Sequence, residues 1–429
     1  MKKKKVSVVG GGLAGLATAY ALSKNTNVEV DLFETQAFLG GRIQSRMIRG
    51  QSIDFGGFLI YPWYTQCLSL IRELGLSDEL AKTPLKDIYY SLRAGEAPLT
   101  MGELPFSTLE GLKIWSKAFF KLFPEADVAQ PDLDRFGQKT ISDYLRETLG
   151  TAGHAGLYET YFDTVSQGYC YGPITTTKAA FMAPIVRQTT LHGDIRSTSF
   201  FSRGTALLVD RLSDAIIAKG GRIHLNSPVT GVKGLTLHMG KRDQKSDVIV
   251  FAQNVTHDLF RQILPEVKPD CWYTHFLTAV IELGATPVVG GVEDWAAIFY
   301  APEDVRREQV LSVINLSVLY GPSLERCIMA NVVLRDDLLG AMGDPGIKKI
   351  LTDELSRLFP PLKKAKVLDC VHWDVAMPVA QEDFVKAIRK RQGKDDYYFA
   401  GDYLGAPSIE TAISTGLSAA KHVLSSILD

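Results

Sequence analysis

The chain has 429 residues, more than one ordinary hydrophobic core holds, so we expect at least two domains. An apolar content of 46% and a charged content of 22% are typical of a soluble globular protein, and no apolar run reaches transmembrane length. The net charge of −1 argues against nucleic acid as a partner, and five scattered cysteines without a C-x-x-C pair argue against a disulfide framework or a zinc site.

The first 34 residues predict a strand, a glycine-rich turn, a helix and a second strand. Residues 6–9 form an apolar run, the sequence Gly-Gly-Gly-Leu-Ala-Gly follows at 10–15, and a helical pattern continues to Lys24. A second apolar run at 28–33 ends in Glu34. This order of elements is the context in which a G-x-G-x-x-G turn binds a dinucleotide, so we predict such a site here.

Each glycine in this unit, and the acid that ends it, has a structural role in binding a dinucleotide. Gly10 permits the tight turn, Gly12 lets a pyrophosphate approach the main chain, and Gly15 permits close packing of helix on strand. The free N–H groups and the positive dipole end of the helix attract the phosphates. Glu34 lies nineteen residues after Gly15, where an acid accepts a hydrogen bond from an adenosine ribose.

The beginning of the chain also imitates a secretory signal peptide. Lys2 to Lys5 would be its basic region, and the apolar stretch that ends near Ala21 would be its core. Cleavage there would remove the first strand and the glycine turn and leave Glu34 without a role. We therefore expect the binding motif, with the lysines as a solvated end, and a protein of the reducing cytoplasm.

Two glycine pairs follow the first unit. Gly40-Gly41 precedes Arg42, and Asp54-Phe55 precedes Gly56-Gly57. Such pairs suggest main chain that lies close to a ligand, although each pair alone is a common turn. Arg42 adds a fixed positive charge suited to a phosphate. A helix is predicted at 66–76.

Residues 85–200 predict a largely helical insertion that is dense in aromatic side chains. We expect these side chains to form core first and pocket walls second. Lys113, Lys117 and Lys121 recur every four residues, which a solvated stripe on a packed helix explains. The alternative is an interfacial helix at 111–124 that makes peripheral contact with a membrane.

The middle of the chain alternates predicted helices and strands. They are a helix at 206–219, strands at 222–225 and 248–252, a strand-rich stretch at 272–335, a helix at 347–358 and a strand at 365–372. The end of the chain repeats the strand, turn and helix order of its beginning, with a buried strand at 397–400, a turn at Gly401-Asp402 and a helix from Ser408 to Leu424. Because parallel sheets bind ligands at the carboxyl ends of their strands, this turn and helix are expected at a second part of the same ligand.

Together these motifs resemble the flavin-containing amine oxidoreductase superfamily, which includes amine oxidases, protoporphyrinogen oxidases and phytoene, carotenoid and squalene desaturases. The resemblance spans nearly the whole chain. The motifs that carry it are Gly10 to Gly15 with Glu34, Gly40-Gly41-Arg42, Asp54-Phe55-Gly56-Gly57, Asn226-Ser227-Pro228-Val229, Trp373 with Pro378, and Ala400-Gly401-Asp402 through Gly416.

The resemblance implies an α/β fold with two domains. A discontinuous, Rossmann-like FAD-binding domain would consist of residues 1–85, 200–255 and 365–429. A second, substrate-binding domain of mixed β-sheet plus helices would consist of residues 86–199 and 256–364.

The resemblance also implies which residues hold FAD. Glu34 would bind the adenosine ribose, and Val229 would contact adenine through its main chain. The pyrophosphate would lie against the turn and its glycine neighbours, namely Gly10, Gly12, Ala14, Gly15, Gly41 and Gly57. Arg42 would lie near the pyrophosphate or the flavin, and Asp402 would reach the phosphate or ribityl portion. Trp373 would either touch the flavin or pack in the core.

At the flavin itself, Ser408 and Ile409 would set a helix N-terminus against the pyrimidine ring. The dipole of that helix favours the negative charge that appears on reduction. Covalent members of the superfamily attach flavin to a cysteine beyond the counterpart of Trp373. No cysteine follows Cys370, so FAD is expected to be non-covalent.

The subfamily is less clearly indicated. Amine oxidases usually place a lysine near the reactive flavin nitrogen, on a strand matching 276–283, and this chain has no lysine between Lys268 and Lys348. Gly401-Asp402-Tyr403 resembles the desaturases, whereas residues 297–334 resemble protoporphyrinogen oxidases.

We therefore predict an FAD-dependent oxidoreductase that removes hydride from a small apolar organic substrate, in the manner of a desaturase or protoporphyrinogen oxidase. The alternatives are an amine oxidase and a flavin-binding protein without turnover. No catalytic acid or base is predicted, because His372 beside Trp373 fits an ordinary strand position better. The sequence shows no metal-ligand set and leaves the oligomeric state open.

Overall fold

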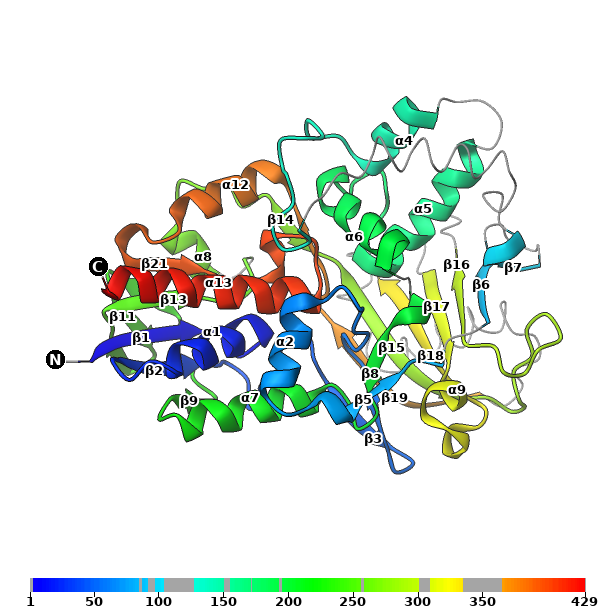
Figure 1. Cartoon of the computed structure of the whole chain (residues 1–429), viewed down its shortest axis with the longest axis horizontal. Helices are drawn as coiled ribbons and strands as arrows, with labels where there is room; N and C mark the ends of the chain where they lie inside the picture. Colours follow the sequence, from blue (N-terminus) through cyan, green and yellow to red (C-terminus); the bar gives the residue numbers. More distant parts are fainter. Residues whose placement is uncertain are drawn as a thin grey trace.

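The computed structural model describes residues 3–84, 87–91, 97–103, 127–149, 155–170, 172–192, 195–255, 258–300, 309–334 and 365–428. Two sheets organise these residues, a five-stranded sheet at one end and a seven-stranded sheet at the other (Figure 1). The helix expected at 347–358 and the lysine stripe at 111–124 lie outside the described residues.

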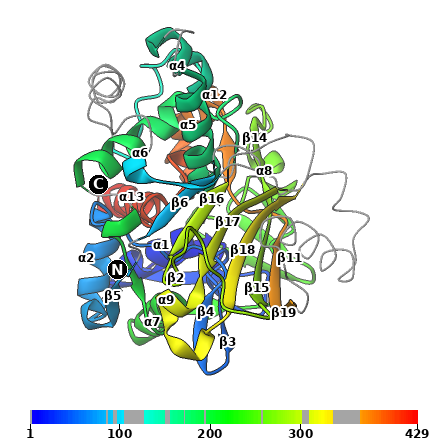
Figure 2. The same cartoon turned by 90° about the vertical axis from the view of Figure 1, so that its right-hand side faces the viewer.

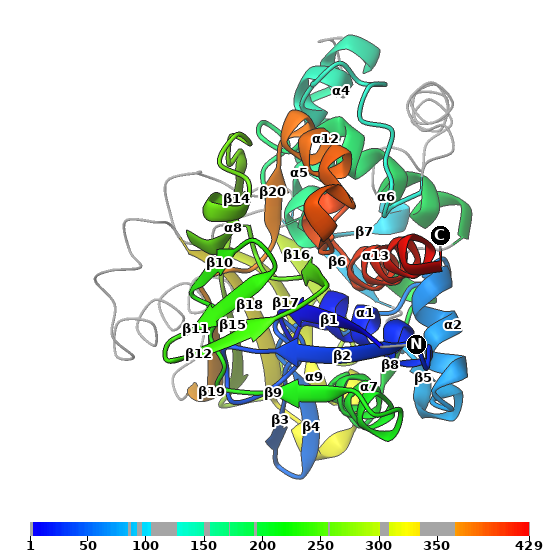
Figure 3. The same ribbon diagram turned by 90° about the vertical axis from the view of Figure 1, so that its left-hand side faces the viewer.

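The five-stranded sheet is parallel throughout. Its strands, in spatial order, are β21 (Tyr397–Phe399), β13 (Val248–Phe251), β1 (Lys4–Val9), β2 (Val28–Phe33) and β9 (Arg222–His224). β13 is apolar and buried at every position, and β1 is buried from Val6 to Val9, as expected where both faces of a parallel sheet are covered. The first strand and the C-terminal end of the last helix lie at the same end of the molecule (Figure 3).

Three helices pack together beside this sheet. They are α1 (Leu13–Ser23), α7 (Ala206–Ala218) and α13 (Ile409–Leu428), with α1 in contact with the other two. The crossing of α1 and α13 is very close, because a Cβ atom added at Gly416 would lie 2.3 Å from the carbonyl oxygen of Ala14. Thr18 Oγ1 donates to both Ala14 O and Gly416 O and so ties the two helices together.

The seven-stranded sheet is mixed. Its strands, in spatial order, are β19 (Lys366–Trp373), β15 (His275–Glu282), β18 (Cys327–Leu334), β17 (Gln309–Asn315), β16 (Ala297–Tyr300), β6 (Ile88–Ser91) and β7 (Leu99–Thr100). All neighbours are antiparallel except β16 and β6. Figure 2 shows this sheet in front of α1 and β2.

Two segments of the chain contribute strands to this sheet. The insertion expected to be largely helical has helices at 141–149, 155–170 and 179–192, and it also contributes the short strands β6 and β7. Residues 366–373, expected as a strand, form an edge of the seven-stranded sheet, and the assignment of 365–429 to an FAD-binding domain stays a prediction. An apolar pattern predicts that a strand exists but not which strand it pairs with, and β19 pairs with β15 from Phe276 to Glu282.

The remaining elements surround the two sheets. The helices are α2 (Thr65–Glu73), α4 (Ile141–Leu149), α5 (Ala155–Cys170), α6 (Ala179–His192), α8 (Asp258–Ile263), α9 (Leu316–Tyr320) and α12 (Glu382–Arg391). The strands are β3 (Ser45–Ile48), β4 (Gln51–Asp54), β5 (Leu80–Lys82), β8 (Ser199–Phe201), β10 (Gly231–Lys233), β11 (Thr236–Met239), β12 (Arg242–Lys245), β14 (Cys271–Tyr273) and β20 (Pro378–Ala380).

No helix in the described part of the chain is both long enough and apolar enough to cross a bilayer. The cysteines described there, Cys67, Cys271, Cys327 and Cys370, are not joined in disulfides.

Candidate functional site

The glycine turn lies between the end of β1 and the start of α1. Gly10 has a φ of +111°, and a Cβ atom there would lie 2.8 Å from the carbonyl oxygen of Ala252, so only glycine fits. Gly12 is the N-cap of α1, and a Cβ atom there would meet nothing within 4 Å. No side chain caps this helix, and the N–H groups of its first turn, including Ala14 and Gly15, are the donors expected to meet a pyrophosphate.

The second glycine pair packs against this turn. Gly40 N donates to Gly11 O at 2.9 Å, and Gly12 and Gly40 form a parallel bridge. A Cβ atom at Gly41 would lie 3.4 Å from the Cα atom of Gly12. The tertiary structure therefore places the residues before Arg42 beside the open end of α1.

Glu34 lies at the edge of the same turn. Its Oε2 accepts from Gly11 N at 2.6 Å and its Oε1 from Gln36 N at 2.8 Å. Ser227 N donates to Glu34 O, which brings the segment before Val229 alongside. Val229 is buried, and none of the hydrogen bonds among the described residues involves its main chain. The main-chain groups that adenine would need are therefore available.

An ion-pair network supports this end of the site and was not expected from the sequence. Asp31 on β2 accepts from Arg222 Nε at 2.7 Å and from His224 Nε2 at 2.7 Å. Burial raises the pKa of the Asp31 carboxyl, but these hydrogen bonds and charges outweigh burial and lower it. The His224 ring stacks on Phe33, with 4.7 Å between ring centroids. The network holds β9 against β2 next to Glu34, because Phe33, the partner of His224, immediately precedes that residue.

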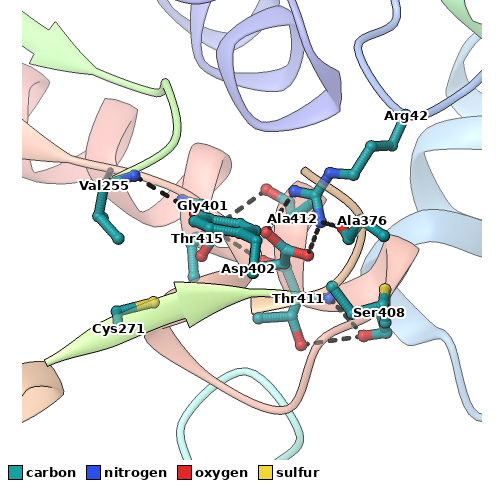
Figure 4. A network of polar contacts seen from close by, with 12 residues as sticks. Arg42, Val255, Cys271, Ala376, Gly401, Asp402, Ser408, Thr411, Ala412 and Thr415 are labelled. Atoms are coloured by element: carbon teal, nitrogen blue, oxygen red, sulfur yellow. Dashed lines mark hydrogen bonds and ion pairs between the residues drawn. The ribbon is translucent and has the colours of Figure 1, made fainter. Parts of the chain in front are cut away.

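Arg42 and Asp402, assigned separately to the cofactor, are also each other's partners (Figure 4). Two nitrogens of Arg42 donate to the two carboxylate oxygens of Asp402 at 2.7 and 2.6 Å, and Arg42 Nη1 also donates to Ala376 O. Burial lowers the pKa of the Arg42 guanidinium, but the charge and hydrogen bonds of Asp402 outweigh it and raise the pKa. The Asp402 side chain is 7% exposed and that of Arg42 is 35% exposed, so the pair keeps a face open on the arginine side.

The N-terminus of α13 lies close to the second glycine-rich segment. Ser408 Oγ accepts from Thr411 N at 3.0 Å and so caps the helix. A Cβ atom at Gly57 would lie 3.5 Å from Ile409 Cγ1, and Gly57 is exposed. The main chain at 57 and the start of α13 are thus near enough to face one ligand.

Glu410 joins this helix to α2. Its carboxylate is buried and accepts from Gln66 N and Cys67 N, both at 2.8 Å, and from Thr65 Oγ1 at 3.2 Å. Burial raises the pKa of Glu410, and these hydrogen bonds oppose the rise. Sequence analysis missed this role, because the acid and the helix it caps are far apart along the chain.

Trp373 joins the seven-stranded sheet to the segment that follows β4. Its Nε1 donates to Phe55 O at 3.3 Å, and its ring packs among the apolar side chains of the seven-stranded sheet. His372 Nδ1 lies 3.4 Å from the carboxylate of Asp374. No group of three or more possible metal ligands occurs among the residues that the structure describes.

Individual contacts bring many of the sequence-predicted site residues near one another. These residues include Val229 and Glu34, the N-terminus of α1, the Arg42–Asp402 pair, and Gly57, Ile409 and Trp373. That an extended dinucleotide lies along these groups stays a prediction, and so do the atoms of FAD that each residue contacts.

The chain is similar to known proteins over short and long stretches of its sequence. Human (Homo sapiens) prenylcysteine oxidase 1 is 34% identical over 87 residues, which cover 20% of this chain and only 17% of that protein's length. The zeta-carotene desaturase of Arabidopsis thaliana is 22% identical over 494 aligned positions, covering 98% of this chain and 85% of the desaturase.

Solved structures show the same fold. Cyclohexylamine oxidase from Brevibacterium oxydans superimposes with a TM-score of 0.71 at 19% identity, covering 100% of both chains. The family model of flavin-containing amine oxidoreductases matches residues 13–424. The chain therefore belongs to the flavin-containing amine oxidoreductase family and is a flavin-dependent oxidoreductase.

Proposed function

We propose that this chain binds FAD without a covalent bond and uses it to remove hydride from a small apolar organic substrate. The observation that carries the proposal is the presence of two helix N-termini near the Arg42–Asp402 pair. One is the start of α1, which no side chain caps, and the other is the start of α13, where Ser408 accepts from Thr411 N. A dinucleotide needs positive potential at its phosphates, and a flavin needs it at the ring portion that becomes negative on reduction. FAD supplies the hydride acceptor when it is bound.

The residues of the chain bind FAD, orient it and shield it from water. Gly12 and Gly41 admit the pyrophosphate to the main chain, and Glu34 holds the ribose. Asp402 holds the guanidinium of Arg42 in a fixed orientation through two hydrogen bonds, so that the charge is positioned before the cofactor arrives. Trp373, packed on Phe55, excludes water from the side of the seven-stranded sheet.

An apolar substrate is supported by the seven-stranded sheet. Val280, Met329 and Ile314 lie on the face that packs with Phe55, and the strand expected to carry the lysine of amine oxidases, β15, carries none. The similarity to a carotene desaturase along nearly the whole chain points in the same direction. An amine oxidase is the second candidate, favoured by the fold shared with cyclohexylamine oxidase.

The test begins with the purified chain and its absorption spectrum. The proposal predicts a bound flavin that acid or denaturant releases as free FAD, and a flavin-free preparation that takes up FAD. Candidate amines, polyprenoids and tetrapyrroles are then added without oxygen, and bleaching of the flavin is recorded. Bleaching by an apolar substrate supports the proposal, bleaching by amines alone favours the amine oxidase, and tight flavin that nothing bleaches favours a protein without turnover.

A further inference from the structure

One face of the seven-stranded sheet turns toward the residues proposed to border the flavin. Side chains alternate between the faces of a strand, so Phe276, Thr278 and Val280 of β15 share one face. Trp373 pairs with Phe276 on this face and bonds to Phe55, two residues before Gly57. This face, here called the inner face, is therefore the one that a substrate next to the flavin would meet.

A row of polar side chains crosses the inner face. The strand registers pair Thr278 with Asn331, Asn331 with Ser312, and Ser312 with Phe299. These side chains therefore stand next to one another on neighbouring strands, in the order Thr278, Asn331, Ser312. We call them the polar row.

The side chains around the polar row are apolar. On one side of it lie Val280, Met329 and Ile314, and on the other lie Phe276, Val333 and Trp373. The charged side chains at the border of this face, Arg46 and Asp369, are paired with each other at 2.9 Å. The polar row is therefore an uncharged hydrogen-bonding strip within an apolar wall.

The polar row keeps unused hydrogen-bonding capacity. Asn331 Nδ2 donates to Ser312 Oγ at 2.9 Å, and this is the one side-chain hydrogen bond of the row among the described residues. The Ser312 hydroxyl proton, the second amide proton of Asn331 and Asn331 Oδ1 remain available. Thr278 and Ser312 are 2% and 7% exposed, whereas Asn331 and Val333 are partly exposed. Polar groups in such a wall cost free energy unless something bonds to them.

We infer that Asn331 and Ser312 bind an uncharged hydrogen-bonding group, a carbonyl, hydroxyl or amide, of an otherwise apolar substrate. This inference rests on the proposed function and adds a specificity to it. Among the described residues, the charged side chains at the border of the inner face, Arg46 and Asp369, are already paired with each other, and a pure hydrocarbon would leave the row unbonded. Substrates with one neutral polar group should therefore be selected over both.

The test measures binding to the FAD-loaded chain by equilibrium dialysis without oxygen. Four probes share one apolar chain and differ in the head group, namely decanamide, 1-decanol, decanoate and decylammonium. The two neutral probes are expected to bind at least tenfold tighter than the two ions. Asn331→Leu and Ser312→Ala should each weaken binding of the neutral probes by about tenfold, the factor that corresponds to one hydrogen bond of about 1.4 kcal/mol.

Ser323→Ala is the matched control, because it also removes a single hydroxyl group but at an exposed position outside the inner face, and its binding should equal that of the wild type. Ser312→Ala removes a single oxygen and keeps the test valid if Asn331→Leu does not fold. Equal binding of the four probes, no binding of any, or tighter binding of an ion overturns the inference. Failure of the chain to take up FAD, measured first, refutes the proposed function instead.

Discussion

The pH dependence of the stability that Asp54 contributes is a test of the folded structure. It is 1% exposed and accepts hydrogen bonds from Ser45 Oγ and from Thr205 N and Oγ1, so it caps the start of α7. Burial raises the pKa of its carboxyl to about 6, against the opposing effect of these hydrogen bonds. We expect Asp54→Asn to remove this titration, because an amide side chain cannot ionise and still offers an oxygen to Thr205 N.

The sign and size follow from proton linkage. With a pKa raised from 3.8 to about 6, the folded chain binds more protons than the unfolded chain between these values, so its stability falls as pH rises through this window. A shift of about two units at about 1.4 kcal/mol per unit makes this loss about 3 kcal/mol. With an unfolding entropy of about 2 cal/mol/K per residue, that corresponds to a change in Tm of about 3 °C.

The measurement is the Tm of wild type and Asp54→Asn, followed by intrinsic fluorescence at half-unit steps from pH 4 to pH 7.5. The Tm of the wild type minus that of the variant should decrease by about 3 °C between pH 4 and pH 6.5 and then stay constant. Asp78→Asn, at an exposed position, is the control and should run parallel to wild type. A difference that is constant with pH, or that grows as pH rises, contradicts the buried, raised-pKa carboxyl.

Three further substitutions test other parts of the site. Glu34→Ala should weaken FAD binding at least tenfold, measured by dialysis of the flavin, because it removes the proposed ribose acceptor and the acceptor of Gly11 N. Glu410→Ala should destabilise the chain by about 2 kcal/mol or more, seen as a lower Tm, because it leaves the buried donors at the start of α2 unbonded. Gly416→Val should cost at least about 3 kcal/mol, because its Cβ would overlap the Ala14 carbonyl oxygen.

The two stability predictions have controls, and all three predictions have a contrary result. Glu325→Ala, at an exposed acid, should leave the Tm unchanged where Glu410→Ala lowers it. Lys421→Val, on an exposed face of the helix that carries Gly416, should cost only a few tenths of a kcal/mol. Full FAD affinity in Glu34→Ala, or wild-type Tm values in the other two variants, would show that the contacts described here do not matter.

Much of the cofactor side was predictable because its signals are local. The glycine turn, α1, β2 and Glu34 are consecutive, and the structure has the strand and helix within a residue or two of the expected bounds. The last strand, the Gly401-Asp402 turn and α13 were predicted for the same reason, although α13 continues to Leu428. Turn residues and apolar periodicity need no information beyond their own segment.

Only the tertiary structure decided which residues from distant parts of the chain became bonding partners. The sequence indicated Arg42 and Asp402 as separate ligands of a cofactor, but only the fold makes them a pair. Three other features also depend on contacts between distant segments. They are the caps that Asp54 and Glu410 provide, the place of β19 in the seven-stranded sheet and the register of the polar row. A side chain's type limits what it can bond to, whereas the choice among partners is made when packing brings remote segments within hydrogen-bonding distance.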